Sequence, residues 1–420
     1  MNNFFGDAVY EFDHESGMHV QLITKKGFRR KYAAIAVDFG SIDAEFLYNG
    51  EHVFVPDGTA HFLEHKMFEK PDGDIFNKYA AFGAQSNAFT TYSRTSYHFD
   101  CTDNFEQNID ILFELVFKPY FTRENVEKEK GIIIQEINMC IDDPYHINYL
   151  ELLKLLYKVS PAKKDIAGTE ESVMSITPEI LYKCYNAFYR PDNMCLTVVG
   201  DIDVETVKSA LQRANLPKRD DSPVIKIKKD EPSELAGLRS LCKMETSVPL
   251  FVFGFKDAAQ KYTGTERLKR KVAGEITADL LFSTTSDLYD DLYRSGDIYY
   301  FYAGYTIERD FGQFSIMGES DRVETVAEKV KKHISKIASE GIDKDIFERY
   351  KKAIYGMQIR TFDRPSALMH NFGKFYLQGV DLFDYLDICG KITEKDVNDF
   401  IKDLLCKEMA VSIVEPKGGN

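Results

Sequence analysis

The sequence predicts an α+β protein of two homologous domains, each a mainly antiparallel sheet packed against helices. Its 420 residues exceed what one hydrophobic core usually serves, and 44% apolar residues can fill two cores. The order of strands and helices expected in the first half recurs in the second half, which indicates a tandem duplication. We therefore expect one domain at residues 1–216, a linker at 217–237 and a second domain at 238–420.

Apolar alternation and the turn signals between alternating segments predict the elements of the first half. Strands are expected at 20–24 and 32–39, and a hairpin with a polar turn is expected from 87–92 and 96–101. Helices are expected at 75–82, 105–117, 123–141, 147–157, 177–189 and 204–214, with a strand at 194–199 before the last of them.

The stretch 216–237 has the composition of a solvated linker, because it contains Pro217, Ser222, Pro223 and a run rich in Lys, Asp and Glu. Beyond it the order repeats, with a strand at 250–255, a helix through Leu281, strands at 298–306 and 311–317, two long helices and a terminal strand at 409–414. This recurrence is the main evidence for the duplication.

The most informative motif is His61-Phe62-Leu63-Glu64-His65. Residues four apart on a helix are neighbours, so both imidazoles can reach one ion while the Glu64 carboxylate points to the same side. A helix is expected to begin near Gly58, where Asp57 or Thr59 can accept hydrogen bonds from the free backbone N–H groups. Three protein ligands with an open fourth position are typical of catalytic zinc. The alternative is a pair of surface histidines on a charged helix.

A third ligand is expected on the carboxylate-rich helix at 123–141. Glu129 and Glu136 are seven residues apart, or two helical turns, and therefore lie on one face. Glu136 is flanked by Ile134 and Ile137, where a carboxylate would be buried at a cost unless it met a metal or a cation. Glu129 has a more charged neighbourhood and suits a supporting role beside a ligand. Spacing alone leaves open that these carboxylates belong to a solvated helix face.

The second half lacks this motif. An alignment of residues 277–283 with residues 59–65 places Asp279, Phe282 and Ser283 at the three motif positions. The counterpart of Glu136 falls at Ile354, Tyr355 or Gly356, depending on the register. This set binds zinc poorly. Because the duplicated fold forms without the histidines, a metal site is favoured over a purely structural role for them.

Charge and hydropathy exclude some classes of function. A formal charge of −14 argues against nucleic-acid binding, which depends on basic surface. No apolar run approaches the length that spans a bilayer, and the first residues lack the basic and apolar regions of a secretory signal. We therefore expect a cytoplasmic protein with no membrane span and no nucleic-acid partner.

These motifs resemble those of the pitrilysin-family (inverzincin) zinc peptidases of the mitochondrial-processing-peptidase type, and most closely the YmfH-type group of Gram-positive bacteria. In that family His-x-x-Glu-His is followed about seventy residues later by Glu-x6-Glu, whose second Glu is the third ligand. Glu129 and Glu136 match this pattern. Gly-Thr-Ala before His61, Phe68 after His65 and the segment 83–90 also match, and the likeness spans essentially the whole chain.

The resemblance implies a zinc endopeptidase with one Zn²⁺ per chain, bound by His61, His65 and Glu136. Glu64 would deprotonate a zinc-activated water, and Glu129 would have a supporting role. The two domains would form half of a clam-shell chamber that admits small unfolded peptides.

Substrate contacts are implied near the metal. In the family an extended peptide adds to the sheet edge, which corresponds here to Asn87, Ala88 and Phe89. Phe68 would border the pocket for the residue after the cut. The alternatives are that Asn87 is an ordinary hairpin residue and that Phe68 belongs to the core.

The family's oxyanion donors are an Arg and a Tyr of the second domain, and this chain departs from their spacing. Tyr293 stands where Arg is expected if Tyr300 takes the Tyr position, so Arg294 with Tyr300 is the nearest match. Alternatively, a partner subunit supplies the donors. We expect a homodimer, or a heterodimer in which the metal-bearing chain is active only with a paralogous metal-free subunit. A non-peptidase scaffold that keeps a metal for stability alone is the remaining alternative.

Overall fold

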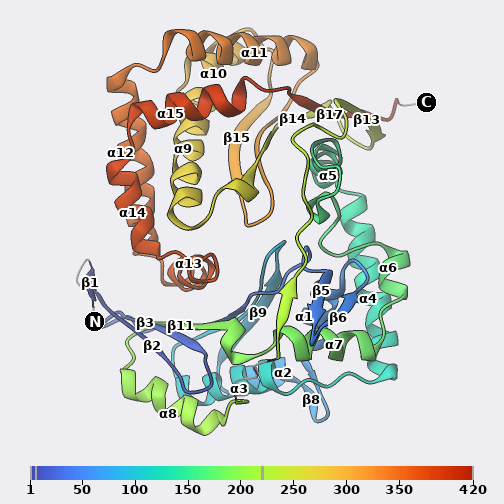
Figure 1. Ribbon diagram of the computed structural model, residues 1–420, viewed down its shortest axis with the longest axis vertical. Coiled ribbons are helices and arrows are strands. Elements are labelled where there is room, and N and C mark those ends of the chain that lie inside the picture. The colour runs from blue at the N-terminus through green and yellow to red at the C-terminus, as the bar shows by residue number, and fades with distance from the viewer. Residues whose placement is uncertain (1, 5–6, 219–221, 419–420) are drawn as a thin grey trace. The chain divides into compact units, whose positions relative to one another are not determined.

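Two sheets, each packed against helices, organise the protein (Figure 1). The structure is a computed structural model that describes residues 2–4, 7–218 and 222–418. The chain divides into two compact units. The first unit comprises Met1–Ile137, Asp165–Ile227 and Arg360–Leu382, and the second comprises Asn138–Lys164, Lys228–Ile359 and Phe383–Asn420.

Seven strands form the main sheet of the first unit, and neighbours pair antiparallel except β3 and β11, which pair parallel. In sheet order they are β1 (Asn2–Phe4), β2 (Asp7–Asp13), β3 (His19–Thr24), β11 (Met194–Gly200), β4 (Lys31–Val37), β10 (Thr95–Cys101) and β9 (Ala84–Thr90). Strand β9 is therefore the last strand at one edge. Ile35, Tyr97 and Leu196 point into one hydrophobic core.

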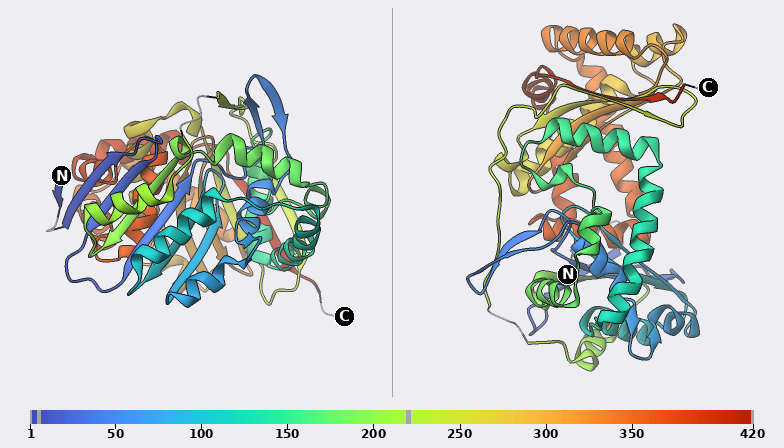
Figure 2. Two further views of the ribbon diagram at one scale, coloured as in Figure 1. Left: turned by 90° about the horizontal axis from the view of Figure 1, so that it is seen from below. Right: turned by 90° about the vertical axis from the view of Figure 1, so that its right-hand side faces the viewer.

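The helices of the first unit pack into this core. They are α1 (Thr59–Lys66), α2 (Ile75–Ala81), α3 (Phe105–Phe117), α4 (Arg123–Ile141, long and teal in the right view of Figure 2), α6 (Glu170–Met174), α7 (Pro178–Phe188) and α8 (Val204–Ala214). Two further sheets are small: β12 (Val224–Lys226), β5 (Glu45–Tyr48) and β6 (Glu51–Phe54) in one, β7 (Glu69–Lys70) and β8 (Gly73–Asp74) in the other.

Helix α13 (Pro365–Leu377) covers the opposite face of the first sheet, although it comes from the second half of the sequence. Ala36 and Thr197 point to this face because they alternate with the core residues of β4 and β11. A Cβ at Gly373 of α13 would lie 3.3 Å from the Ala36 side chain and 3.5 Å from that of Thr197. The small residue at this position therefore permits a close helix–sheet approach.

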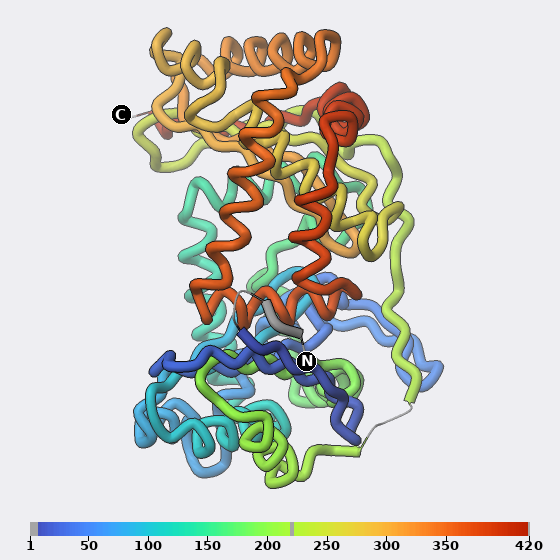
Figure 3. The backbone as a smooth tube through the Cα atoms, turned by 90° about the vertical axis from the view of Figure 1, so that its left-hand side faces the viewer, coloured from blue at the N-terminus to red at the C-terminus, as the bar shows by residue number. Residues whose placement is uncertain are grey.

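Five strands form the sheet of the second unit. In sheet order they are β13 (Arg239–Met244), β17 (Ala410–Pro416), β14 (Leu250–Asp257), β16 (Gly312–Glu319) and β15 (Tyr300–Ile307). Its helices are α5 (Pro144–Leu156), α9 (Gly264–Phe282), α10 (Asp287–Arg294), α11 (Val323–Glu340), α12 (Lys344–Thr361), α14 (Leu382–Lys391) and α15 (Glu394–Phe400); the path from α12 through α13 to α14 runs from orange to red in Figure 3. Nowhere in the described ranges is a helix both long and apolar enough to cross a membrane.

The predicted duplication is confirmed by the strand order. The five strands β3-β11-β4-β10-β9 correspond one by one to β13-β17-β14-β16-β15, with a parallel first pair and antiparallel pairs after it. Each compact unit also contains a helix from the other half of the sequence, α5 in the second unit and α13 in the first. Helix α5 packs on β14 and β17, as α13 packs on β11 and β4. The predicted domains at 1–216 and 238–420 stay a prediction about the limits of the two sequence repeats. The compact units differ from these domains, because residues 138–164 belong to the second unit and residues 360–382 belong to the first.

The expectation of a solvated run between the halves is wrong in two places. Residues 224–226 form β12, which pairs with β5. The side chain of Glu231 is only 5% exposed and accepts hydrogen bonds from the backbone N–H groups of Lys158 (2.8 Å), Val159 (2.8 Å) and Ser160 (2.6 Å). Lys256 Nζ lies 2.6 Å from the same carboxylate. Burial would raise the pKa of Glu231, but these donors outweigh it and hold the pKa below its ordinary value.

We expect Glu231→Gln to lower the free energy of unfolding by about 2 kcal/mol at neutral pH, because a buried carboxylate with charged and backbone donors loses its charge. A depressed pKa contributes stability above the unfolded-state pKa of about 4.3, and this contribution is lost as the pH falls. The difference between variant and wild type, measured by urea unfolding, should therefore shrink on acidification. Glu234→Gln, at a carboxylate that is 69% exposed, is the control. Equal losses in both variants would contradict the assignment.

Candidate metal centre

Helix α1 carries the motif and begins at a turn that only glycine fits. Gly58 precedes the helix with φ 87°, and a Cβ there would lie 2.3 Å from the carbonyl oxygen of Ala167. The residue at the start of α1 is Gly58, which has no side chain to accept hydrogen bonds, and the Thr59 hydroxyl donates to the Pro56 carbonyl at 2.7 Å. A cap by the Asp57 side chain stays a prediction. Phe62 and Leu63 are fully buried. Core packing therefore fixes the helix and leaves the other face to His61, Glu64 and His65.

Helix α4 supplies the facing carboxylates. Ile133 and Ile137 of α4 belong to the same hydrophobic core as Phe62 and Leu63 of α1. The seven-residue spacing then places Glu129 and Glu136 two turns apart on one side of the helix. The expected burial of Glu136 is wrong, because its side chain is 44% exposed, whereas that of Glu129 is 13% exposed.

The structure brings His61, His65 and Glu136 together. One ligand atom from each lies within 4.8 Å of the others. His61 Nε2 is 3.5 Å from Glu136 Oε1, and His65 Nε2 is 3.4 Å from Glu136 Oε2. A tetrahedral ion with bonds of about 2.1 Å separates its ligand atoms by about 3.4 Å, and two imidazoles with one carboxylate are a donor set that suits zinc. The residues present therefore fit a zinc ion with three protein ligands.

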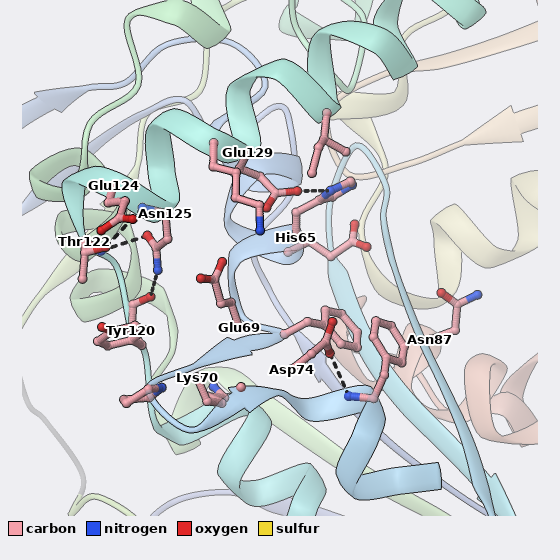
Figure 4. Close-up of a pocket in the computed structure, with 17 residues that line it drawn as sticks. His65, Glu69, Lys70, Asp74, Asn87, Tyr120, Thr122, Glu124, Asn125 and Glu129 are labelled. Atoms are coloured by element: carbon pink, nitrogen blue, oxygen red, sulfur yellow. Dashed lines mark hydrogen bonds and ion pairs between the residues drawn. The ribbon is translucent and has the colours of Figure 1, made fainter.

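Glu129 contacts His65 on the side away from the ligand cluster. Its Oε1 lies 3.2 Å from His65 Nδ1, and Figure 4 shows the two side chains pointing toward one another. With the Nδ1 proton donated to Glu129, Nε2 is left as the metal-facing atom. Burial would raise the pKa of Glu129, but its bond to His65 and the charge of Lys66 lower it.

In the absence of a metal, contacts within the cluster shift the pKa values of His65 and Glu136. Burial would lower the pKa of His65, but hydrogen bonds to Glu129 and Glu136 outweigh it and raise the pKa to about 9. Hydrogen bonds from His61 and then His65 hold the pKa of Glu136 far below its ordinary value. A bound cation would replace the proton in this arrangement.

Glu64 is held apart from the ligands. Its side chain is nearly buried, and its Oε2 accepts a hydrogen bond of 2.7 Å from the Thr90 hydroxyl at the end of β9. One carboxylate oxygen thus has a fixed partner, and Glu64 also lines the cavity beside the cluster. Glu64 is not a member of the group of three potential ligands, and its role as a general base stays a prediction.

A cavity of about 770 Å³ adjoins His65 within the first unit. Phe68 lines it and stacks on Phe76 with ring centroids 4.5 Å apart, and Asn87 lines it from β9. Figure 4 also shows Glu69 pointing from β7 toward α4. Of the predicted substrate residues, Phe68 and Asn87 therefore meet at this cavity.

Ala88 and Phe89 are not among the described residues that line the cavity. Ala88 is buried in the core, and its backbone N–H donates to the Asn87 side chain at 2.9 Å. Phe89 packs against His370 of α13, with ring centroids 5.2 Å apart. The structure therefore gives no side-chain contact of these two residues with this cavity, and their role as substrate contacts stays a prediction.

Arg294 and Tyr300 belong to the second unit, at the end of α10 and at the start of β15. Arg294 is 77% exposed, and its Nε lies 2.7 Å from Asp290 one turn earlier. Tyr300 is 47% exposed. Their role as oxyanion donors stays a prediction.

Two of the positions aligned with the zinc motif of the first half lie in the second unit. Asp279 on α9 and Ile354 on α12 line one cavity of about 530 Å³ in the second unit. Within the described ranges, no second group of three potential metal ligands was found.

Two functional contacts were not foreseen from the sequence. Thr90 holds Glu64, and Lys66, directly after His65, has a fully buried side chain that contacts Glu129. A lysine at the end of a core helix was the only available signal for the second contact.

Two protein-family models match the chain: insulinase (peptidase family M16) at residues 30–170, and the peptidase M16 inactive domain at residues 175–354. The chain is 36% identical over 418 residues to a Bacillus subtilis (strain 168) protein named uncharacterized zinc protease YmfH, covering 98% of this chain and 97% of that one. A crystal structure described as that of an M16-like peptidase from Alicyclobacillus acidocaldarius has a TM-score of 0.95 at 32% identity, covering 99% of both chains. A Helicobacter pylori protease shares the fold, with a TM-score of 0.83 at 17% identity over 98% of this chain and 100% of that one.

Zinc binding is expected to displace a proton from His65 at neutral pH. Because the pKa of His65 is raised to about 9, a proton competes with the metal below that pH. The apparent zinc affinity should rise about tenfold per pH unit toward about pH 9 and then level off, as measured with a zinc-buffering chelator of known protonation. In Glu129→Gln, the apparent zinc affinity should level off at a lower pH than in the wild type. An affinity that does not change with pH would contradict the assignment.

Proposed function

The chain belongs to peptidase family M16, as its motifs indicated, and on that premise we propose that it is a zinc-dependent endopeptidase that cleaves small unfolded peptides. One observation carries the proposal: Glu64 lies beside a cluster of three potential zinc ligands without being one of them. A purely structural zinc usually takes four protein ligands and needs no base. This argues against a scaffold that keeps a metal for stability alone.

Zinc would be held by His61, His65 and Glu136, one ion per chain. When bound, zinc acts as a Lewis acid and lowers the pKa of a coordinated water toward neutrality. The residues of the chain have to position the ion, accept the proton and hold the peptide.

Glu64 is the proposed general base and acid. Its carboxylate accepts a proton from the attacking water and delivers that proton to the amine that leaves when the peptide bond breaks. The bond from Thr90 to Oε2 leaves Oε1 for this transfer. Glu129 acts indirectly, because its contact with His65 fixes the orientation of that imidazole.

The peptide is proposed to bind as an added strand on β9, the last strand of the first sheet. The N–H of Ala88 bonds to the Asn87 side chain, so this donor faces the open edge and can be taken over by a peptide carbonyl. The cavity lined by Phe68 and Asn87 then receives a substrate side chain next to the ligand cluster. Main-chain pairing of this kind requires an extended, unfolded substrate.

The oxyanion donors and the assembly are also proposals. Arg294 and Tyr300 are the candidates within the chain, and a partner subunit is the alternative. The M16 resemblance supports a chamber formed by similar domains, in a homodimer or with a metal-free paralogue.

We expect Glu64→Gln to bind one zinc per chain and to lose peptide cleavage by a factor of about 1,000, because the amide cannot accept the proton. Zinc content is measured by elemental analysis, and cleavage is measured with an unbiased peptide mixture. The control is Glu127→Gln, on the exposed side of α4, which should retain both properties. Undiminished cleavage by Glu64→Gln would refute the assignment of the base.

A further inference from the structure

Lys66 places a buried positive charge behind the metal cluster. It is the last residue of α1, directly after His65, and its side chain is fully buried. Its Nζ lies 3.3 Å from Glu129 Oε2 and also contacts the Glu69 carboxylate. A buried ammonium group is costly unless it is paired, so these contacts explain how the fold tolerates a lysine here.

Glu129 divides its two oxygens between Lys66 and His65. Oε2 faces the ammonium group, and Oε1 lies 3.2 Å from His65 Nδ1. A carboxylate held at both oxygens cannot rotate away from the imidazole, and it remains an acceptor at Nδ1. The orientation of His65 therefore depends on two contacts: the one between His65 and Glu129, and the one between Glu129 and Lys66.

We propose that Lys66 is a positioning residue that acts through Glu129 to hold His65 Nε2 toward the metal. The inference rests on the proposed function, because it requires a zinc ion at the cluster of His61, His65 and Glu136. Lys66 is neither one of the three potential ligands nor one of the residues that line the cavity beside them, so we do not assign it a catalytic role.

Two other roles for Lys66 predict different results. Its charge repels a nearby cation, so a purely electrostatic role would make zinc bind more tightly when the charge is removed. Its contact with Glu69 could simply anchor β7. Glu69 is 37% exposed and so can be solvated, which makes Glu129, at 13% exposure, the partner that depends more on Lys66.

The test is a double-mutant cycle on zinc affinity. Lys66→Met, Glu129→Gln and the double variant are prepared metal-free, and zinc binding is measured by competition with a chromogenic chelator. Each single variant should bind zinc about 10-fold to 100-fold more weakly, as is usual when a partner of a ligand is removed. The double variant should be no weaker than Glu129→Gln alone, because Lys66 acts through that residue.

The matched control is Lys130→Met. Lys130 is next to Glu129 in the sequence and is equally a buried lysine, but its Nζ contacts Glu127 at 2.7 Å and the Met174 carbonyl at 2.9 Å. This variant should keep the zinc affinity within about threefold, since it removes a buried charge without touching Glu129. Circular dichroism of the metal-free variants establishes that each is folded, and Lys66→Gln replaces Lys66→Met if the latter is not.

The outcomes separate this inference from the proposed function. Tighter zinc binding by Lys66→Met, or losses that multiply in the double variant, would overturn the positioning role while leaving the zinc site intact. A wild-type protein that binds no zinc would overturn both. A loss in Lys66→Met that disappears in the Glu129→Gln background supports the inference even if no peptide substrate has been found.

Discussion

The candidate site depends on the register between two helices. Helix α1 offers His61 and His65 one turn apart, and α4 offers Glu129 and Glu136 two turns apart, so one relative placement brings three contacts into range together. Phe62 and Leu63 of α1 share a hydrophobic core with Ile133 and Ile137 of α4, and this packing fixes the placement. A shift by one turn would remove Glu136 from both imidazoles. Apolar packing thus sets the position of the polar site.

Charge compensation is the second constraint. Glu64, Glu129 and Glu136 surround two imidazoles, and each carboxylate has a partner of its own or shares one. Glu64 contacts Thr90, Glu129 contacts Lys66 and His65 Nδ1, and Glu136 contacts His61 and His65 Nε2. Without such partners, neighbouring carboxylates would raise one another's pKa and exclude each other's charged forms. In the metal-free protein the raised pKa of His65 supplies a positive charge, and a divalent ion takes over that role when it binds.

The local parts of this arrangement followed from the sequence. Helical spacing alone identified His61, Glu64 and His65, and the limits of α3 and α4 agree with the predicted ranges. The duplication was visible as a repeated order of elements and is matched by the strand pairing of both sheets. Periodicity is a local property, and these features depend on it.

The features that the sequence did not predict depend on contacts between distant segments of the chain. The exchange of α5 and α13 between units, the carboxylate of Glu231 on a turn seventy residues away, and the pairing of Lys66 with Glu129 each join segments that the sequence does not relate. The expected burial of Glu136 failed for a similar reason, since its isoleucine neighbours face the core while the carboxylate does not. The central claim is tested most directly by crystals of the protein grown with zinc and measured on both sides of the zinc absorption edge. The account predicts one anomalous peak among His61 Nε2, His65 Nε2 and a Glu136 oxygen, at about 2.0 to 2.2 Å from each. A zinc-supplied crystal with no peak there, or with its peak elsewhere, would contradict it.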